Sequence, residues 1–147
     1  MAPAERMLFT WWLATKRPLP LQMWFDVHMD GIPGDLAPAS LADLTDDPAM
    51  LRMWWYQTAK RCDVILRWPL EYQVVELRHT TAPQTVGELH IYDNLSRAEW
   101  PDLPWRPPLL ITERIDPKIH NLLLDSGYQI ANPSPTAKPA GPVAQVR

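Results

Sequence analysis

Three residues of types that bind metals, Asp26, His28 and Asp30, alternate along one short segment of the sequence. Side chains two residues apart on a β-strand project from the same face, which places all three within reach of one cation. Carboxylate and imidazole groups bind zinc and related metals, and such a site would support a small metal-dependent hydrolase. The same spacing is also typical of the solvated face of an amphipathic strand.

The eight residues from His28 to Asp35, with the sequence HMDGIPGD, resemble the metal-ligand strand of dinuclear zinc aminoacylase-like peptidases. This resemblance implies hydrolysis at a zinc centre. It covers these eight residues alone, and the chain lacks the length and the other acidic and histidine ligands of that family. We therefore assign no metal ligand, no cofactor and no catalytic residue from the sequence.

The single cysteine, Cys62, could pair with His79 or His90 as the nucleophile and base of thiol catalysis. Its position in a stripe of apolar residues at helical spacing favours a different role, because a free cysteine in such a stripe is usually a small buried residue. One cysteine also forms no intrachain disulfide and no thiolate zinc cluster. We expect a structural cysteine in a reducing compartment.

Two further histidines invite an interpretation. His90 stands between Glu88 and Tyr92 at strand spacing, which would give either an acid–base surface or a polar ladder between strands. His120 lies beside an apolar helical stripe and is expected to be an exposed helical residue.

The tryptophans point to binding rather than catalysis. Adjacent side chains on a helix or strand cannot all face one small core, so some indoles of the adjacent pairs should be exposed, and exposed indoles are enriched at interfaces. The segment 93–108 adds two indoles among four prolines, and we expect a stiff apolar loop there. The expected partner-binding residues are Trp11, Trp12, Trp54, Trp55, Trp100 and Trp105.

Charge and composition exclude several classes of protein. The chain has 14 Lys and Arg against 17 Asp and Glu, a net charge of −3, so nucleic acid is an unlikely partner. The segment from Asp26 to Asp47 contains six aspartates and no basic residue, so its negative charge could attract a neighbouring molecule. The five glycines are scattered, so phosphate-binding loops are absent, and no apolar run is long enough to span a membrane. We expect a cytoplasmic protein, or one incorporated into a particle assembled inside the cell.

The hydrophobic pattern predicts the elements that must position these residues. Strict alternation over Leu21–Met29 indicates a strand with Met23 and Phe25 on its buried face. The apolar run before it predicts either a strand pairing with it in a hairpin or a buried helix over Glu5–Ala14. A long helix should begin at Asp47, with Leu51, Trp54, Trp55, Thr58, Cys62 and Ile65 as its stripe, and end before Pro69.

The second half of the chain reads as strands and a short helix. We expect strands over 72–78, 86–92, 109–115 and 128–131. A short helix should begin after Asp116 and stop at Gly127, because an aspartate caps free amides and a glycine suits the end of a helix.

These elements predict an α+β fold in a single domain, residues 1–131, followed by a Pro/Ala-rich tail, residues 132–147. The sheet should be mainly antiparallel, an N-terminal hairpin plus a β-meander, packed with one long and one or two short helices. The expected function is a non-enzymatic interaction or assembly subunit of a larger complex, such as a small component of a virion or a multi-subunit machine, which binds a protein partner or itself. The alternatives are the metal-dependent hydrolase at Asp26, His28 and Asp30, and an inhibitor that binds a host complex.

Overall fold

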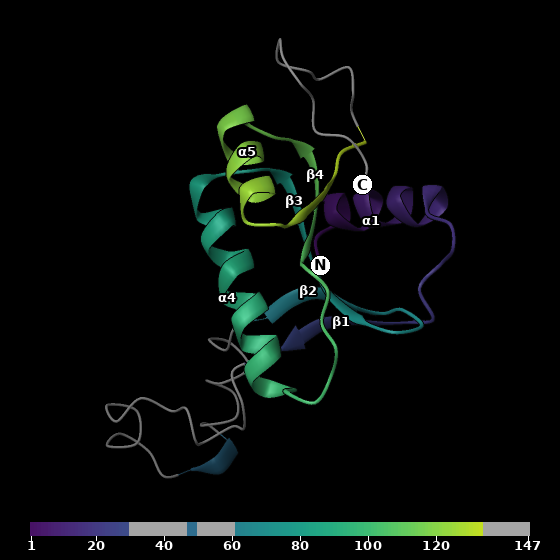
Figure 1. Ribbon diagram of the computed structural model, residues 1–147, viewed down its shortest axis with the longest axis vertical. Coiled ribbons are helices and arrows are strands. Elements are labelled where there is room, and N and C mark those ends of the chain that lie inside the picture. Colours follow the sequence, from purple (N-terminus) through teal and green to yellow (C-terminus); the bar gives the residue numbers. More distant parts are fainter. Residues whose placement is uncertain (30–46, 50–60, 134–147) are drawn as a thin grey trace.

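The computed structural model describes residues 1–29, 47–49 and 61–133 of the chain (Figure 1). This part contains three named helices and a five-stranded sheet, so the predicted α+β class is confirmed. The elements are α1 (Pro3–Thr15), β1 (Gln22–His28), β2 (Arg61–Arg67), β3 (Tyr72–Thr80), α4 (Pro83–Glu99), β4 (Leu109–Arg114), α5 (Pro117–Asp125) and β5 (Gln129–Ala131).

The strands lie across the sheet in the order β1-β2-β3-β4-β5. β2 runs antiparallel to both of its neighbours, whereas β3, β4 and β5 are parallel. Parallel neighbours need a crossover connection, and α4 and α5 supply one each. The sheet is therefore mixed, which corrects the prediction of a hairpin plus a meander.

Successive residues of the central strands alternate between two covered faces, which makes three layers (Figure 1). Val64 of β2 packs in one cluster with Leu8 and Trp12 of α1. The next residue, Ile65, packs in another cluster with Tyr92 of α4. The α1 face also buries Leu66, Val75, Leu77, Leu109, Ile111 and Ala131, and the opposite face buries Val74, Leu110 and Ile130.

Proline and capping residues fix where the helices begin and end. α5 begins after Asp116, whose carboxylate accepts a hydrogen bond of 2.7 Å from the backbone N–H of Lys118. It is followed by Gly127 at φ 80°, a left-handed conformation that favours glycine. Both signals were predicted from the sequence, and strands β3, β4 and β5 also match predicted strands.

The N-terminal half differs from the predicted hairpin. Residues 3–15 form α1, the helical alternative, and this helix covers the sheet instead of pairing with β1. β1 is a strand as predicted, but the first part of its expected buried face is open, with Phe25 48% exposed and Met23 also exposed, whereas Met29 after the strand is buried. The reason is that β1 lies at the edge of the sheet, beyond most of the cover of α1. The alternation predicted the strand correctly, and it predicted the burial of Met23 and Phe25 wrongly.

Two predicted elements are wrong. Cys62 and Ile65 were expected on a long helix, but they belong to β2, which is buried on both faces. A strand that is covered on both sides has no alternation of apolar and polar residues. Its continuous apolar run was therefore interpreted as the apolar stripe of a helix. Residues 86–92 were expected to be a strand and lie in α4, where Leu89 and Tyr92 are buried and Ile91 is exposed.

Parts of several predictions lie outside the described residues. These include Asp30 of the proposed metal site, Trp54 and Trp55, the middle of the predicted long helix, most of the acidic segment and the tail from residue 134. At the predicted start of that helix, the Asp47 carboxylate accepts a hydrogen bond of 3.0 Å from the backbone N–H of Ala49.

Candidate functional site

Two acidic side chains, Asp63 of β2 and Glu76 of β3, lie within the central strands among apolar neighbours. Residues two apart on a strand share a face, so Glu76 falls on the side of Val74, which packs with α4. Asp63 is linked to β3 through the backbone of Leu77 and the side chain of Arg78.

The two strands part beside these carboxylates. The antiparallel register between β2 and β3 ends at Val64 and Val75, although both strands continue. Beyond that point the backbone N–H of Leu77 donates a hydrogen bond of 2.7 Å to Oδ2 of Asp63. A side-chain carboxylate thus satisfies a buried backbone donor of the central strand, which fixes the orientation of Asp63.

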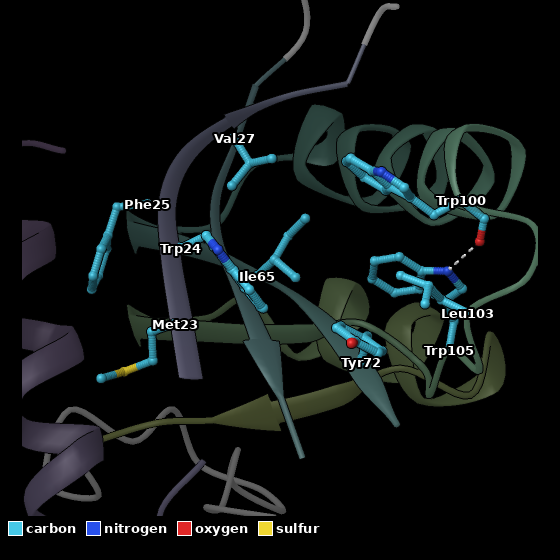
Figure 2. A pocket seen from close by; sticks show the side chains of 9 residues that line it. All are labelled: Met23, Trp24, Phe25, Val27, Ile65, Tyr72, Trp100, Leu103 and Trp105. Carbon is cyan, nitrogen blue, oxygen red and sulfur yellow. Dashed lines mark hydrogen bonds between the residues drawn. The ribbon is translucent and has the colours of Figure 1, made fainter. Parts of the chain in front are cut away.

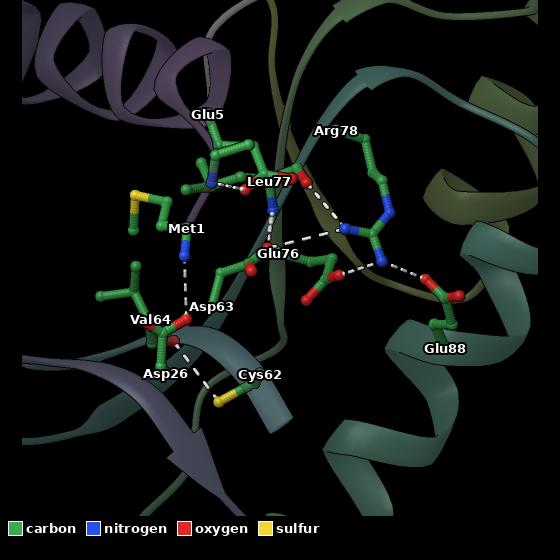
Figure 3. A network of polar contacts seen from close by, with 11 residues as sticks. Met1, Glu5, Asp26, Cys62, Asp63, Val64, Glu76, Leu77, Arg78 and Glu88 are labelled. Atoms are coloured by element: carbon green, nitrogen blue, oxygen red, sulfur yellow. Dashed lines mark hydrogen bonds and ion pairs between the residues drawn. The ribbon is translucent and has the colours of Figure 1, made fainter. Parts of the chain in front are cut away.

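One arginine holds the cluster together (Figure 3). Arg78, two residues after Glu76 on the same face of β3, places Nη2 2.5 Å from Oε1 of Glu76 and 2.6 Å from Oε2 of Glu88 on α4. Its Nη1 lies 3.8 Å from Oδ2 of Asp63 and donates to the backbone oxygen of Leu77 at 2.9 Å. The guanidinium therefore links two strands and one helix.

Glu76 is the most buried acid of the cluster. Its side chain is 2% exposed. Burial, and after it the negative charge of Asp63, raises the pKa of Glu76 to about 9, against the opposing effect of Arg78. At neutral pH Glu76 therefore keeps its proton, and this protonated group is hydrogen-bonded to the side chain of Asp63.

The cluster carries more negative than positive charge. Three carboxylates, those of Asp63, Glu76 and Glu88, face the single guanidinium of Arg78. Burial raises the pKa of Asp63, the hydrogen bond from the Leu77 backbone opposes this, and the charge of Glu5 on α1 adds to the rise. The cluster thus combines acidic groups of raised pKa with one guanidinium at the border of the core.

Sequence reasoning missed this cluster. Asp63 was assigned to a helix, and Glu76 and Arg78 fell on the predicted strand over 72–78 without an assigned role. The usable signal was the pair Glu76 and Arg78, two opposite charges on one face of a strand that also contains Val74, Val75 and Leu77. Charged residues in a strand that is buried on both sides indicate a site, but the sequence pattern does not show that the second face is covered.

The predicted metal ligands are only partly placed. Asp26 adopts a φ of 50°, and its carboxylate lies 3.3 Å from the amino group of Met1. His28 ends β1, and Asp30 lies outside the described residues. Among residues 1–29, 47–49 and 61–133, no three His, Cys, Asp or Glu side chains are grouped to hold a metal ion. The three-ligand site at this segment stays a prediction.

The predicted thiol pair is not assembled in the part of the chain that the structure describes. Cys62 is fully buried. Its burial raises the pKa of its thiol, and the negative charges of Glu76 and Asp63 add to this effect. Nδ1 of His79 lies 2.6 Å from Oε2 of Glu113. The thiol therefore stays protonated and packs as a structural cysteine, the role that was expected.

The other two histidine predictions need correction. His90 was placed on a strand face with Glu88 and Tyr92, but all three lie on α4, where residues two apart do not share a face. Its Nδ1 lies 3.0 Å from the hydroxyl of Tyr128 instead. His120 was expected to be exposed and is buried on α5, because that helix packs against α4 and β5.

An aromatic cavity of about 740 Å³ lies at the other end of α4 (Figure 2). It is bounded by β1, by Ile65 and Tyr72, and by the segment after α4 that carries Trp100 and Trp105. Trp24 stacks on Tyr72 with ring centroids 6.2 Å apart, and Tyr72 contacts Trp105 at 5.7 Å. The described residues that line this cavity are all uncharged, and most are aromatic, so this part of its wall suits an apolar group.

The predicted partner-binding tryptophans occupy different environments. Trp12 is 1% exposed and belongs to the core beneath α1, whereas Trp11 is partly buried beside it. Trp100 and Trp105 pack against the cluster around Tyr92, and Nε1 of Trp105 donates to the backbone oxygen of Trp100 at 3.2 Å. The predicted loop is also shorter than expected, because residues 93–99 belong to α4.

Within the described residues, no helix has the length and apolar character needed to cross a membrane. Comparisons with protein-family models, with curated proteins and with solved structures found no match to this chain.

Proposed function

We propose that this protein is a divalent-cation-dependent hydrolase of phosphate esters, in which Asp63 and Glu76 hold the cation. The observation that carries the proposal is Glu76, a carboxyl group that is 2% exposed and is grouped with Asp63 and Glu88 around the single guanidinium of Arg78. This site replaces the hydrolase alternative based on Asp26, His28 and Asp30 as the better supported location.

Two carboxylates are enough for a cation of the magnesium type. Mg²⁺ is commonly held by one or two carboxylates, keeps several waters and completes its shell with phosphate oxygens of the substrate. The absence of a three-ligand group among the described residues is compatible with that mode of binding. When bound, such a cation polarises the phosphoryl oxygen and activates water.

The chain's own residues suit the charge that develops on a phosphate. Arg78 is 29% exposed, so its guanidinium borders both the buried carboxylates and solvent. Guanidinium groups bind phosphate oxygens with two parallel hydrogen bonds, and they stabilise the negative charge of the transition state. Attack of water on phosphorus would break the bond to the leaving oxygen, which takes up a proton as it departs.

A purely structural role explains this cluster less well. A buried ion-pair network contributes little net stability, because removing the charges from water costs about as much as their attraction returns. Charged groups in two neighbouring, largely buried strands therefore favour a role in chemistry.

Hydrolysis of bis(p-nitrophenyl) phosphate with Mg²⁺ or Mn²⁺ tests the proposal. We expect cation-dependent release of nitrophenolate that falls about 100-fold or more in Asp63→Asn and in Glu76→Gln. Glu71→Gln is the matched control, because Glu71 also pairs with an arginine, at 2.9 Å from Arg106, but lies outside the cluster. No cation-dependent activity in the wild type, or equal activity in all four proteins, would overturn the proposal.

We also propose a second candidate, a protein-interaction or assembly role, as the tryptophan content predicts. The specific observation is that β1, at the edge of the sheet, exposes Met23, Trp24 and Phe25 beside the aromatic cavity. Exposed edge strands with apolar side chains pair readily with other chains. Light scattering across a concentration series should show association that Trp24→Ala and Phe25→Ser reduce. A monomer at every concentration would contradict self-association.

A further inference from the structure

The aromatic cavity beside β1 is walled by a continuous row of rings (Figure 2). The rings of Trp24 and Tyr72 are stacked with their centroids 6.2 Å apart, and the ring of Trp105 follows at 5.7 Å from Tyr72. Trp105 in turn lies 6.0 Å from Trp100. Grooves lined by aromatic rings bind proline-rich segments, because such segments already adopt the extended polyproline helix and lose little entropy on binding. The cavity therefore suits a short segment of this type.

The chain carries a proline-rich segment at its C-terminus. Residues 133–147 contain four prolines, namely Pro133, Pro135, Pro139 and Pro142. Pro139 and Pro142 stand three residues apart, and a polyproline helix has three residues per turn, so this P-x-x-P spacing places both rings on one side of such a helix. The sequence thus supplies a ligand of the class that an aromatic groove recognises.

The charges beside the cavity are complementary to those of this tail. Glu99 and Asp102 are exposed next to Trp100, and neither forms an ion pair with another residue of the described ranges 1–29, 47–49 and 61–133. The basic side chains of the same stretch, Arg97 and Arg106, are each paired with a carboxylate. The charged side chains of the tail are both basic, and one of them directly precedes Pro139. Opposite charges of this kind guide association and fix the direction of a bound segment.

The place where the tail leaves the fold favours the tail of a second copy. Strands β3, β4 and β5 are parallel, and Tyr72 is the first residue of β3, so the cavity lies at the N-terminal end of these strands. The tail follows β5, whose last residue, Ala131, is at their C-terminal end. β5 also lies at the opposite edge of the sheet from β1. A tail of the same chain would have to run back along the sheet, whereas the tail of a neighbouring molecule needs no such path.

We propose that the aromatic cavity binds the proline-rich tail of a second copy of this chain. Pro139 and Pro142 pack on the rings of the cavity, and Lys138 lies beside the acidic residues at its border. This inference rests on the second proposed function, self-association, and names the segment that makes the contact. The tail of one copy enters the cavity of the next, so the copies assemble head to tail into rings or open chains.

Light scattering of the full chain across a concentration series tests the inference. The double variant Pro139→Ala/Pro142→Ala should associate about tenfold or more weakly than the wild type, because it removes both rings of the P-x-x-P pair. The matched control, Pro133→Ala/Pro135→Ala, removes the same number of prolines from the tail but keeps this pair. It should associate as the wild type does.

A synthetic peptide of residues 134–147 tests the cavity separately. Calorimetry should show that it binds the full-length variant Pro139→Ala/Pro142→Ala, and that adding Trp24→Ala weakens this binding about tenfold or more. Leu70→Ala is the control for the cavity, because Leu70 is 83% exposed and is not among the lining residues. Excess peptide should also dissociate assemblies of the wild-type protein, a measurement that needs no variant to fold.

The outcomes separate the inference from self-association itself. Equal association of the wild type and Pro139→Ala/Pro142→Ala, or wild-type assemblies that resist excess peptide, overturn the inference and leave self-association through another surface standing. A wild type that stays monomeric while the peptide binds the variant places the tail in the cavity of its own chain, which overturns both. A peptide that does not bind, or that binds equally well with Trp24→Ala, overturns the inference whatever the scattering shows.

Discussion

The carboxylate of Asp63 accepts a hydrogen bond of 2.7 Å from the backbone N–H of Leu77 at the point where the register of β2 and β3 ends. This contact ties an acidic side chain to the backbone of the central strand, directly beside Glu76. Asp63 therefore has little freedom to turn away from the buried acid. The two carboxylates stay together although no backbone ladder joins their strands there.

Stability should depend on pH through Glu76. Because burial raises its pKa from 4.5 to about 9, the folded state keeps a proton that the unfolded state releases between these pH values. The contribution of Glu76 to stability is thus fully present below about pH 4.5 and is lost as the pH rises toward 9. Glu76→Gln should be more stable than wild type at pH 8 by more than about 1 kcal/mol, and similar at pH 4.5.

Urea unfolding at several pH values with EDTA present measures this difference. Glu71→Gln serves as the control, because Glu71 is more exposed and pairs outside the cluster. Parallel curves of unfolding free energy against pH for wild type and Glu76→Gln would contradict the prediction.

Two glycines should respond in opposite directions to the same substitution. Gly127 has a φ of 80°, so Gly127→Ala should cost about 1 kcal/mol from the left-handed backbone alone. Gly87 lies inside α4, and Gly87→Ala should stabilise by up to about 1 kcal/mol through helix propensity. A Cβ at either position meets nothing within 4 Å, so packing does not confuse the comparison. Thermal unfolding that shifts both variants the same way would contradict this account.

Core and edge residues of the sheet should differ in the cost of truncation. Leu66 of β2 is fully buried, and Leu66→Ala should destabilise by about 2–5 kcal/mol. Phe25 is 48% exposed on β1 and contacts Phe9 edge-on at 5.6 Å, so Phe25→Ala should cost about 1 kcal/mol. Denaturant melts of both variants measure the two costs. A loss of about 3 kcal/mol for Phe25→Ala would instead support the buried face predicted from the alternation.

Trp105 should contribute to thermal stability. Its ring contacts Tyr72 and Trp100, and it packs against the cluster around Tyr92. Trp105→Ala should therefore lower the melting temperature by about 4 °C or more. An unchanged melting temperature would contradict this packing and would favour a role as an interface anchor.

Local signals in the sequence predicted β3, β4, α5 and β5, whereas α4 was expected to be a strand. The helix cap at Asp116 and the helix-ending glycine Gly127 predicted the two ends of α5 correctly, because each acts within one turn of the helix. β2 was missed, because a strand buried on both faces has no alternation, and Cys62 and Ile65 happen to stand at helical spacing. The parallel half of the sheet depends on how α4 and α5 cross over, which is a property of the tertiary structure.

The candidate site could not be predicted for the same reason. Glu76 and Arg78 lie on a predicted strand, but the helix α4 that covers their face was itself predicted to be a strand. Asp63 comes close to them only once β2 is recognised as their neighbour. The partner-binding role of the tryptophans stays a prediction, because Trp12 is a core residue and Trp100 and Trp105 pack against a core cluster.

Calorimetric titration of Mg²⁺ into the wild-type protein and into Asp63→Asn tests the central claim most directly. Asp63→Asn keeps an oxygen that accepts the hydrogen bond from Leu77, so it removes the charge with little change of shape. We predict one Mg²⁺ site per chain in the wild type and at least a tenfold loss of affinity in Asp63→Asn. The absence of a binding heat in the wild type, or identical titrations of the two proteins, would contradict the claim that these buried carboxylates form a cation site.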